Sequence, residues 1–125
     1  MHENQIASII VDCAYQVHIK FGPCLFESVY EAALKYELEK CGLRVLNQQK
    51  LPVIYEGVHL EEGFRVDLIV EGKVIVEIKS TEALAPVHTK QVITYLRLSG
   101  KRLGLLINFN VANIGDGTRR IVNNL

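Results

Sequence analysis

Apolar residues at the start of the chain recur three and four positions apart, which is the spacing of one face of an α-helix. We therefore predict a first amphipathic helix over residues 3–20. Its buried stripe is expected to consist of Ile6, Ile9, Ile10, Cys13, Ala14 and Val17. His18 has no second ligand at metal-binding spacing, so we interpret it as a surface or packing residue.

A second helical pattern follows a Gly-Pro breaker and covers residues 26–41. Gly42 suits the position just beyond its end. Ser28 and Glu31 have the spacing of a capping box, so the helix has an alternative start at Ser28. Its buried side chains are expected to be Val29, Tyr30, Ala33, Leu34 and Leu38.

The next part of the chain is rich in β-branched residues and alternates between apolar and polar positions, as strands do. We predict strands over residues 44–55, 58–60, 64–70 and 74–80. Pro52 lies within the first of these, which places that strand at a sheet edge or at a bulge.

The last third of the chain predicts a helix between two strands. Proline suits the first position of a helix over residues 86–99, and Gly100 suits its end. The continuous apolar run 103–109 is typical of a buried strand, parallel to the strand before the helix. A short strand or a tail at 118–122 completes an α/β fold: one domain of 125 residues, with a mixed sheet, a central hairpin and flanking helices.

The central hairpin, residues 64–80, carries several charged side chains. Because strand side chains alternate between faces, we expect one face of its first strand to hold Phe64, Val66, Leu68 and Val70, and the other Arg65, Asp67 and Ile69. On the second strand, one face is expected to hold Val74, Val76 and Ile78, and the other Ile75, Glu77 and Lys79. Two acids and a lysine thus share a nearly apolar setting, where unpaired charges are costly.

The length of the hairpin turn decides whether the two acids meet. A two-residue turn would pair Asp67 with Val76 and separate the carboxylates across the sheet. A three-residue loop over residues 71–73 pairs Asp67 with Glu77 and lets the apolar faces coincide. We therefore predict the three-residue loop.

Two facing carboxylates repel each other, so a cation is the natural third party. Together with a substrate phosphate they suit Mg²⁺, which prefers oxygen ligands and keeps several waters. The alternative is a surface hairpin in which Asp67 or Glu77 forms an ion pair with Arg65 or Lys79.

Asp67, followed by Glu77-Ile78-Lys79, resembles the D…(D/E)-x-K signature of the PD-(D/E)XK nuclease superfamily, with Val66 in place of the usual proline. The resemblance implies a restriction-endonuclease-like core and hydrolysis of phosphodiester bonds with Mg²⁺ or Mn²⁺. It assigns Asp67, Glu77 and the main-chain carbonyl of Ile78 to the metal. It assigns Lys79 to the attacking water and the developing negative charge.

The segment from Cys24 to Tyr30 resembles the motif of the GxxExxY family, which belongs to the same superfamily, with Cys24 in place of the leading glycine. This resemblance assigns Glu27 to the metal site, as the acid contributed by the first helical region. Tyr30 is expected to be a packing residue with a hydroxyl contact. A plainer interpretation of Glu27 is an acid that complements the helix dipole.

Gln91 and Tyr95 lie four residues apart on the third helix and resemble the Q-x-x-x-Y motif of RecB and phage exonuclease type nucleases. The resemblance implies that they orient the nucleophile or a nearby phosphate. By itself the pattern also fits an amphipathic helix with a glutamine at its edge. Arg65, expected on the face of Asp67, suits a clamp on a substrate phosphate.

The chain contains 14 Lys and Arg residues and 14 Asp and Glu residues, so no global field attracts nucleic acid. Binding to nucleic acid, with DNA favoured over RNA, would need a local basic patch. The neutral balance supports an alternative function, a non-catalytic binding or assembly module that retains the nuclease fold. The oligomeric state is left open, with a homo-oligomer as one option.

No apolar run is long enough to span a membrane, and the N-terminus lacks the basic region of a signal peptide. Cys13, Cys24 and Cys41 are odd in number and show no CxxC spacing, so we expect reduced, mostly packed thiols and no zinc site. We therefore expect a cytoplasmic protein without a membrane partner.

Overall fold

The computed structural model describes residues 1–125, except for the side chain of Glu62. Its elements are, in order, α1 (Glu3–Phe21), α2 (Glu27–Lys40), β1 (Val45–Tyr55), β2 (Val58–Val70), β3 (Val74–Lys79), α3 (Pro86–Ser99), β4 (Leu103–Asn108), the 3₁₀ helix η1 (Ile114–Gly117) and β5 (Thr118–Val122). The strands form one five-stranded sheet in the order β1-β2-β3-β4-β5. Only β3 and β4 pair in parallel, so the predicted mixed sheet of an α/β fold is confirmed.

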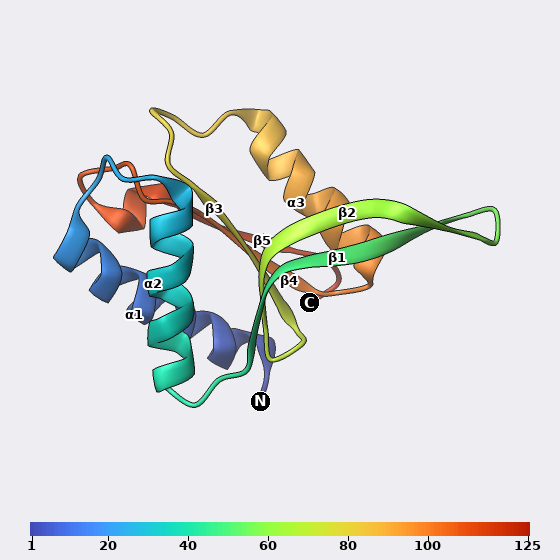
Figure 1. The fold of residues 1–125 in the computed structure, drawn as a ribbon, viewed down its shortest axis with the longest axis horizontal. Coiled ribbons are helices and arrows are strands. Elements are labelled where there is room, and N and C mark those ends of the chain that lie inside the picture. The colour runs from blue at the N-terminus through green and yellow to red at the C-terminus, as the bar shows by residue number, and fades with distance from the viewer.

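The sheet lies between two helical layers. Helices α1 and α2 cover one face, and α3 covers the other (Figure 1). An apolar cluster fills each side: the larger includes Ile10 and Leu34 from α1 and α2, and the smaller includes Val92 and Leu96 from α3. Helix α3 approaches the sheet closely, since a Cβ atom on Gly104 would lie 2.7 Å from Val92 Cγ1.

Strands β1 and β2 continue beyond the rest of the sheet as a two-stranded ribbon (Figure 1). The separate strands predicted over 58–60 and 64–70 are wrong, because residues 58–70 form one strand, β2. The pairing of β1 with β2 shifts between Leu51 and Val53. Pro52 therefore lies at a bulge on an edge strand, as predicted.

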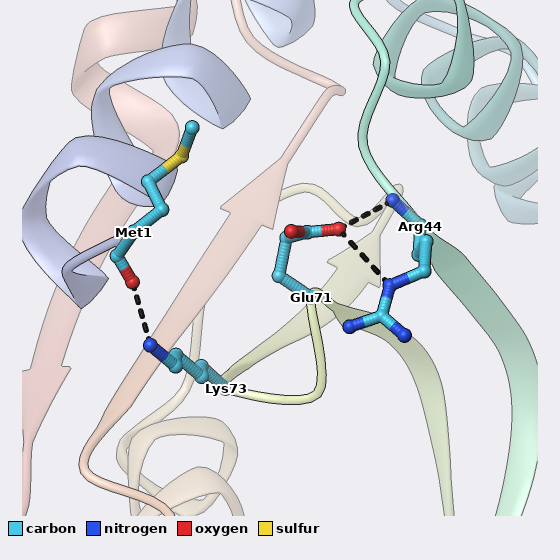
Figure 2. A network of polar contacts seen from close by, with 4 residues as sticks. All are labelled: Met1, Arg44, Glu71 and Lys73. Atoms are coloured by element: carbon cyan, nitrogen blue, oxygen red, sulfur yellow. Dashed lines mark hydrogen bonds and ion pairs between the residues drawn. The ribbon is translucent and has the colours of Figure 1, made fainter.

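The hairpin between β2 and β3 has the predicted three-residue loop, since Val70 pairs with Val74 and Leu68 with Val76. Figure 2 shows how this loop is held. Glu71 Oε2 accepts a hydrogen bond from Arg44 N at 2.7 Å and lies 3.6 Å from Arg44 Nε. Lys73 Nζ donates to the carbonyl of Met1 at 2.7 Å. These contacts fasten the loop to the start of β1 and to the N-terminus, which favours a single register.

We expected the side chains of β2 to alternate regularly between the two sheet faces. This expectation is wrong, because the alternation shifts by one residue near Asp67, a change of phase in the strand. Val66 and Ile69 lie three residues apart yet belong to the same apolar cluster, the one beneath α3. Leu68 instead packs with α1 and α2. An unbroken strand would direct Val66 and Ile69 to opposite faces. Arg65 and Ile69 therefore do not share a face.

Helix α2 begins at Glu27, and its N-cap is Phe26, whose side chain makes no capping hydrogen bond. The alternative start at Ser28 is therefore wrong, since that residue lies inside the first turn. Val29 is exposed rather than buried. Tyr30 is fully buried, as expected.

The three cysteines are free thiols, of which Cys13 is buried while Cys24 and Cys41 are exposed. The expectation that they are mostly packed is therefore wrong for two of them. Among the described helices, none is both long enough and apolar enough to cross a membrane.

Candidate functional site

The site is built where β2 separates from β3. The pairing of these strands ends at Leu68 and Val76. At the next position the Asp67 side chain fills the gap, and its Oδ2 accepts a hydrogen bond from Ile78 N at 2.7 Å. Glu77 Oε1 accepts a longer one, 3.4 Å, from Asp67 N. The predicted meeting of the two acids is thus confirmed, with main-chain bonds that hold both carboxylates in place.

Glu77 is the acid with the most unusual environment. Its side chain is only 4 % exposed, on a strand whose neighbours are almost all apolar. Burial, together with the adjacent Asp67 carboxylate, raises the pKa of Glu77 to about 9. Without a cation Glu77 therefore keeps its proton near neutral pH, because a buried carboxyl beside a second carboxylate does not ionise readily.

Lys79 follows two positions later on β3 and lowers the pKa of Glu77 through its charge. Its distance from either acid nevertheless exceeds that of an ion pair. Among the described side chains, the ion pairs are Lys40 with Glu37 and Arg44 with Glu71. The structural pairing that would explain the acids without a metal is therefore not observed.

An acid of α2 completes the surroundings of Asp67, but it is Glu31. The Gln48 amide donates to Glu31 Oε1 at 2.6 Å and to Asp67 Oδ1 at 3.2 Å, so it bridges the two side chains. The pKa of Glu31 is raised, mainly by burial. A hydrogen bond from Gln48 opposes this shift, and the charge of Asp67 adds to it. Glu31 and Asp67 are therefore electrostatic neighbours.

Glu27, the acid predicted for the metal site, is the first residue of α2, and its side chain reaches the end of β3. Its Oε2 accepts a hydrogen bond from Ser80 N at 3.2 Å. Tyr30 holds the loop before it, because its hydroxyl donates to the Gly22 carbonyl at 2.6 Å and accepts from Leu25 N at 3.2 Å. The predicted packing and hydroxyl contacts of Tyr30 are confirmed.

Gln91 and Tyr95 lie on α3, which covers the sheet face opposite to the one covered by α1 and α2. Burial and the charge of Glu77 raise the pKa of Tyr95, and a hydrogen bond from Gln91 lowers it. The Tyr95 ring is stacked on Phe64 of β2 with centroids 4.5 Å apart. The tyrosine is therefore fixed close to the acid pair, with Gln91 beside it.

Arg65 lies on β2, opposite Lys50 of β1. Because the phase change occurs next to it, a shared face with Asp67 no longer follows from strand alternation. No ion pair joins Arg65 to an acid among the described side chains. Its predicted contact with substrate stays a prediction.

The donor set suits a hard divalent cation in part. Two carboxylates converge, and their mutual repulsion is what a cation would relieve. The Ile78 carbonyl points towards the same gap, because the next carbonyl, that of Lys79, accepts from Phe109 N on the other side. Within the described residues, however, no three His, Cys, Asp or Glu side chains form a metal-binding group. The metal roles of Glu27, Asp67, Glu77 and Ile78 therefore stay predictions.

One known protein family matches nearly the whole chain. A model of the PD-(D/E)XK nuclease superfamily matches residues 4–121, which is nearly the whole chain. The chain belongs to the PD-(D/E)XK nuclease superfamily. No curated protein and no solved structure matches significantly. Nucleases of this superfamily generally hydrolyse nucleic acid and typically use divalent metals such as Mg²⁺ or Mn²⁺.

Within this PD-(D/E)XK domain the structure brings together Asp67, Glu77, Lys79, Gln91 and Tyr95, from three elements. The positions of Glu31 and Gln48 beside Asp67 were not predicted from the sequence. A signal for Glu31 was present, because it lies one helical turn after Glu27 and so shares its face. Gln48 gave no such signal, since its neighbours in space come from α2 and β2.

Proposed function

We propose that this protein is a metal-dependent nuclease that hydrolyses phosphodiester bonds of nucleic acid, with DNA favoured over RNA. One observation carries the proposal: Asp67 and Glu77 converge where β2 and β3 separate, without an ion-pair partner among the described side chains. Such an arrangement is unfavourable for folding and suits a divalent cation. Membership of a nuclease superfamily supports the same conclusion.

In this proposal Asp67, Glu77 and the Ile78 carbonyl hold Mg²⁺ or Mn²⁺. When bound, the ion supplies Lewis-acid chemistry, polarising a phosphoryl oxygen and lowering the pKa of a bound water. The Asp67 carboxylate stays oriented because Ile78 N holds one of its oxygens. Glu77 would hold the ion in its ionised form, so metal binding would release the proton that Glu77 keeps in the metal-free protein.

Lys79 directs the attacking water and stabilises the negative charge that develops on the phosphate. A charged ammonium group suits this role because it is close enough to influence Glu77 and is not tied up in an ion pair with it. Tyr95 and Gln91 orient the water or a neighbouring phosphate. Arg65 clamps a phosphate farther along β2.

The two acids of α2 have different proposed roles. Glu31, linked to Asp67 through Gln48, tunes the charge and orientation of that ligand. Glu27 reaches the metal or its waters from the end of β3, beside Ser80. We also propose membership of the GxxExxY family, because Glu27 and Tyr30 have the spacing of its motif, and a cytoplasmic location, which three free thiols suit.

The test is cleavage by purified protein. With Mg²⁺ or Mn²⁺ the protein should cut labelled DNA or RNA, and EDTA should stop it. Lys79→Ala should reduce cleavage by roughly a hundred- to a thousandfold while metal binding, measured by calorimetry, survives. Lys90→Ala, an exposed lysine of α3, is the control. Equal cleavage by Lys79→Ala and the parent would show that the assigned role is wrong. No cleavage of any substrate by the parent would favour the non-catalytic binding module.

A further inference from the structure

Phe26 is unusual in its exposure and in its position at the start of a helix. Its side chain is 82 % exposed, the most exposed large apolar side chain among those that the structure describes. It also occupies the N-cap of α2, where Ser, Thr, Asp and Asn are preferred, and it makes no capping hydrogen bond. Positions that break local rules are expected where a residue serves function rather than folding.

The loop that carries Phe26 is held rigidly. Cys24 has a φ of 79°, a left-handed conformation that is uncommon outside glycine. Its N–H is held by the Asn110 side chain at 3.0 Å, and Leu25 N is held by the buried Tyr30 hydroxyl. The backbone that carries the exposed phenyl ring is therefore held in place on the surface.

That position adjoins the proposed active site. A pocket of about 420 Å³ is lined by Leu25, Phe26, Glu27, Ser28 and Ser80. Ser80 directly follows Lys79, and it is tied to this loop by a hydrogen bond from its hydroxyl to the Leu25 carbonyl at 2.5 Å. The ring thus forms one wall of a pocket that starts where β3, with Glu77 and Lys79, ends.

We propose that Phe26 binds substrate directly, by stacking on an unpaired base of the nucleic acid next to the phosphate held at Lys79. This inference rests on the proposed nuclease function. A phenyl ring can stack on any base, because every base has a π-face, so the contact adds affinity without sequence preference. The base must leave its own duplex stack, so single strands and frayed ends should be preferred to intact duplex.

The binding test uses the absence of tryptophan from the chain. Phe26→Trp introduces a single tryptophan, whose emission can be excited apart from that of the tyrosines, and combining it with Lys79→Ala slows cleavage in Mg²⁺ enough for binding to be measured first. We expect an unlabelled oligothymidylate to quench its emission. In the control, Tyr36→Trp in the same background, the fluorophore replaces an exposed tyrosine farther along α2, and its emission should stay unchanged.

Three outcomes would overturn the proposal. Equal quenching at both tryptophans would mean that the contact is not specific to this position. Oligonucleotide binding, detected by anisotropy of a labelled strand, without quenching at Phe26→Trp would mean that the base lies elsewhere. Emission that changes with protein concentration instead would assign the ring to contact with a second copy.

Kinetics separate this inference from the proposed function. Phe26→Ala should raise KM for a single-stranded substrate by roughly five- to a hundredfold and leave kcat nearly unchanged. Phe26→Tyr should restore the KM of the parent. Cleavage by the parent with an unchanged KM in Phe26→Ala overturns the stacking alone. No binding and no cleavage by the parent overturns both the stacking and the nuclease function.

Discussion

Asp67 and Ile78 are joined by a side-chain to main-chain hydrogen bond of 2.7 Å that takes the place of a bond between strands. The Asp67 carboxylate acts as the acceptor for Ile78 N beyond the last paired residues, Leu68 and Val76. Together with the bond from Asp67 N to Glu77 Oε1, this contact lies just beyond the paired residues and orients Asp67 beside Glu77. The acid is therefore part of the sheet architecture as well as a candidate ligand.

Asp67→Asn should separate these two roles. Asparagine keeps an oxygen that can accept from Ile78 N, and it removes the repulsion with Glu77. In EDTA the variant should be as stable as the parent or more stable. Magnesium should stabilise the parent by about 2.7 kcal/mol at a hundred times its Kd, and the variant should lose most of this gain.

Melting curves in EDTA and in Mg²⁺ measure both effects. Asp116→Asn, an exposed aspartate on η1, is the matched control and should behave as the parent does. A loss of about 3–5 kcal/mol for Asp67→Asn in EDTA, without any Mg²⁺ gain in the parent, would instead indicate that the Asp67 carboxylate stabilises the fold and does not bind metal.

The stability of the metal-free protein should fall as pH rises. The folded-state pKa of Glu77 is about 9, above its ordinary value of 4.5, so between these values the folded protein binds more protons than the unfolded chain. The free energy of unfolding should therefore decrease across this window. Glu77→Gln should remove most of the decrease, with a residual slope from Glu31, whose pKa is also raised by burial.

Urea denaturation in EDTA, repeated across the same pH range, is the measurement. Glu37→Gln, which removes a surface ion pair with Lys40, serves as the control and should keep the slope of the parent. A parent whose stability is flat or rises across the window would contradict the raised pKa.

Glu31→Gln and Glu27→Gln should differ in metal affinity. Glu31 is linked to Asp67 through Gln48, so its loss should weaken Mn²⁺ binding by roughly ten- to a hundredfold. Glu27→Gln should have the smaller effect, because Glu27 bonds to Ser80 N and is not linked to Asp67. Isothermal calorimetry with Mn²⁺ gives both affinities. A larger loss for Glu27→Gln would restore Glu27 as the principal acid of α2.

Tyr30→Phe should loosen the loop before α2. The variant keeps the ring that stacks on Phe109 at 4.5 Å but loses the hydroxyl that bonds to Gly22 O and Leu25 N. We expect a loss of about 1–2 kcal/mol and faster exchange of the Leu25 amide hydrogen. Tyr36→Phe, with an exposed side chain, should change neither quantity. Unchanged exchange in Tyr30→Phe would show that the hydroxyl does not hold the loop.

Much of the fold could be predicted from local patterns. Helix α3 has the predicted bounds because proline and glycine act at its two ends directly. The register of β2 and β3 was predictable because a one-residue slip would expose an apolar face. The start of α2 was not, because Ser28 has good capping chemistry but the chain uses Phe26 instead.

Which acids meet follows from local sequence, since the loop over residues 71–73 and the apolar alternation leave one favourable register for Asp67 and Glu77. The shared helix face of Gln91 and Tyr95 follows from their spacing in the same way. Three features appear only in the folded chain: the interrupted alternation of β2 near Asp67, the link from this acid through Gln48 to Glu31, and the pocket lined by Phe26 and Ser80. The physical reason is range: turns and periodicity act between near neighbours, whereas a side chain that takes over a strand's hydrogen bond depends on groups that only the folded chain brings together.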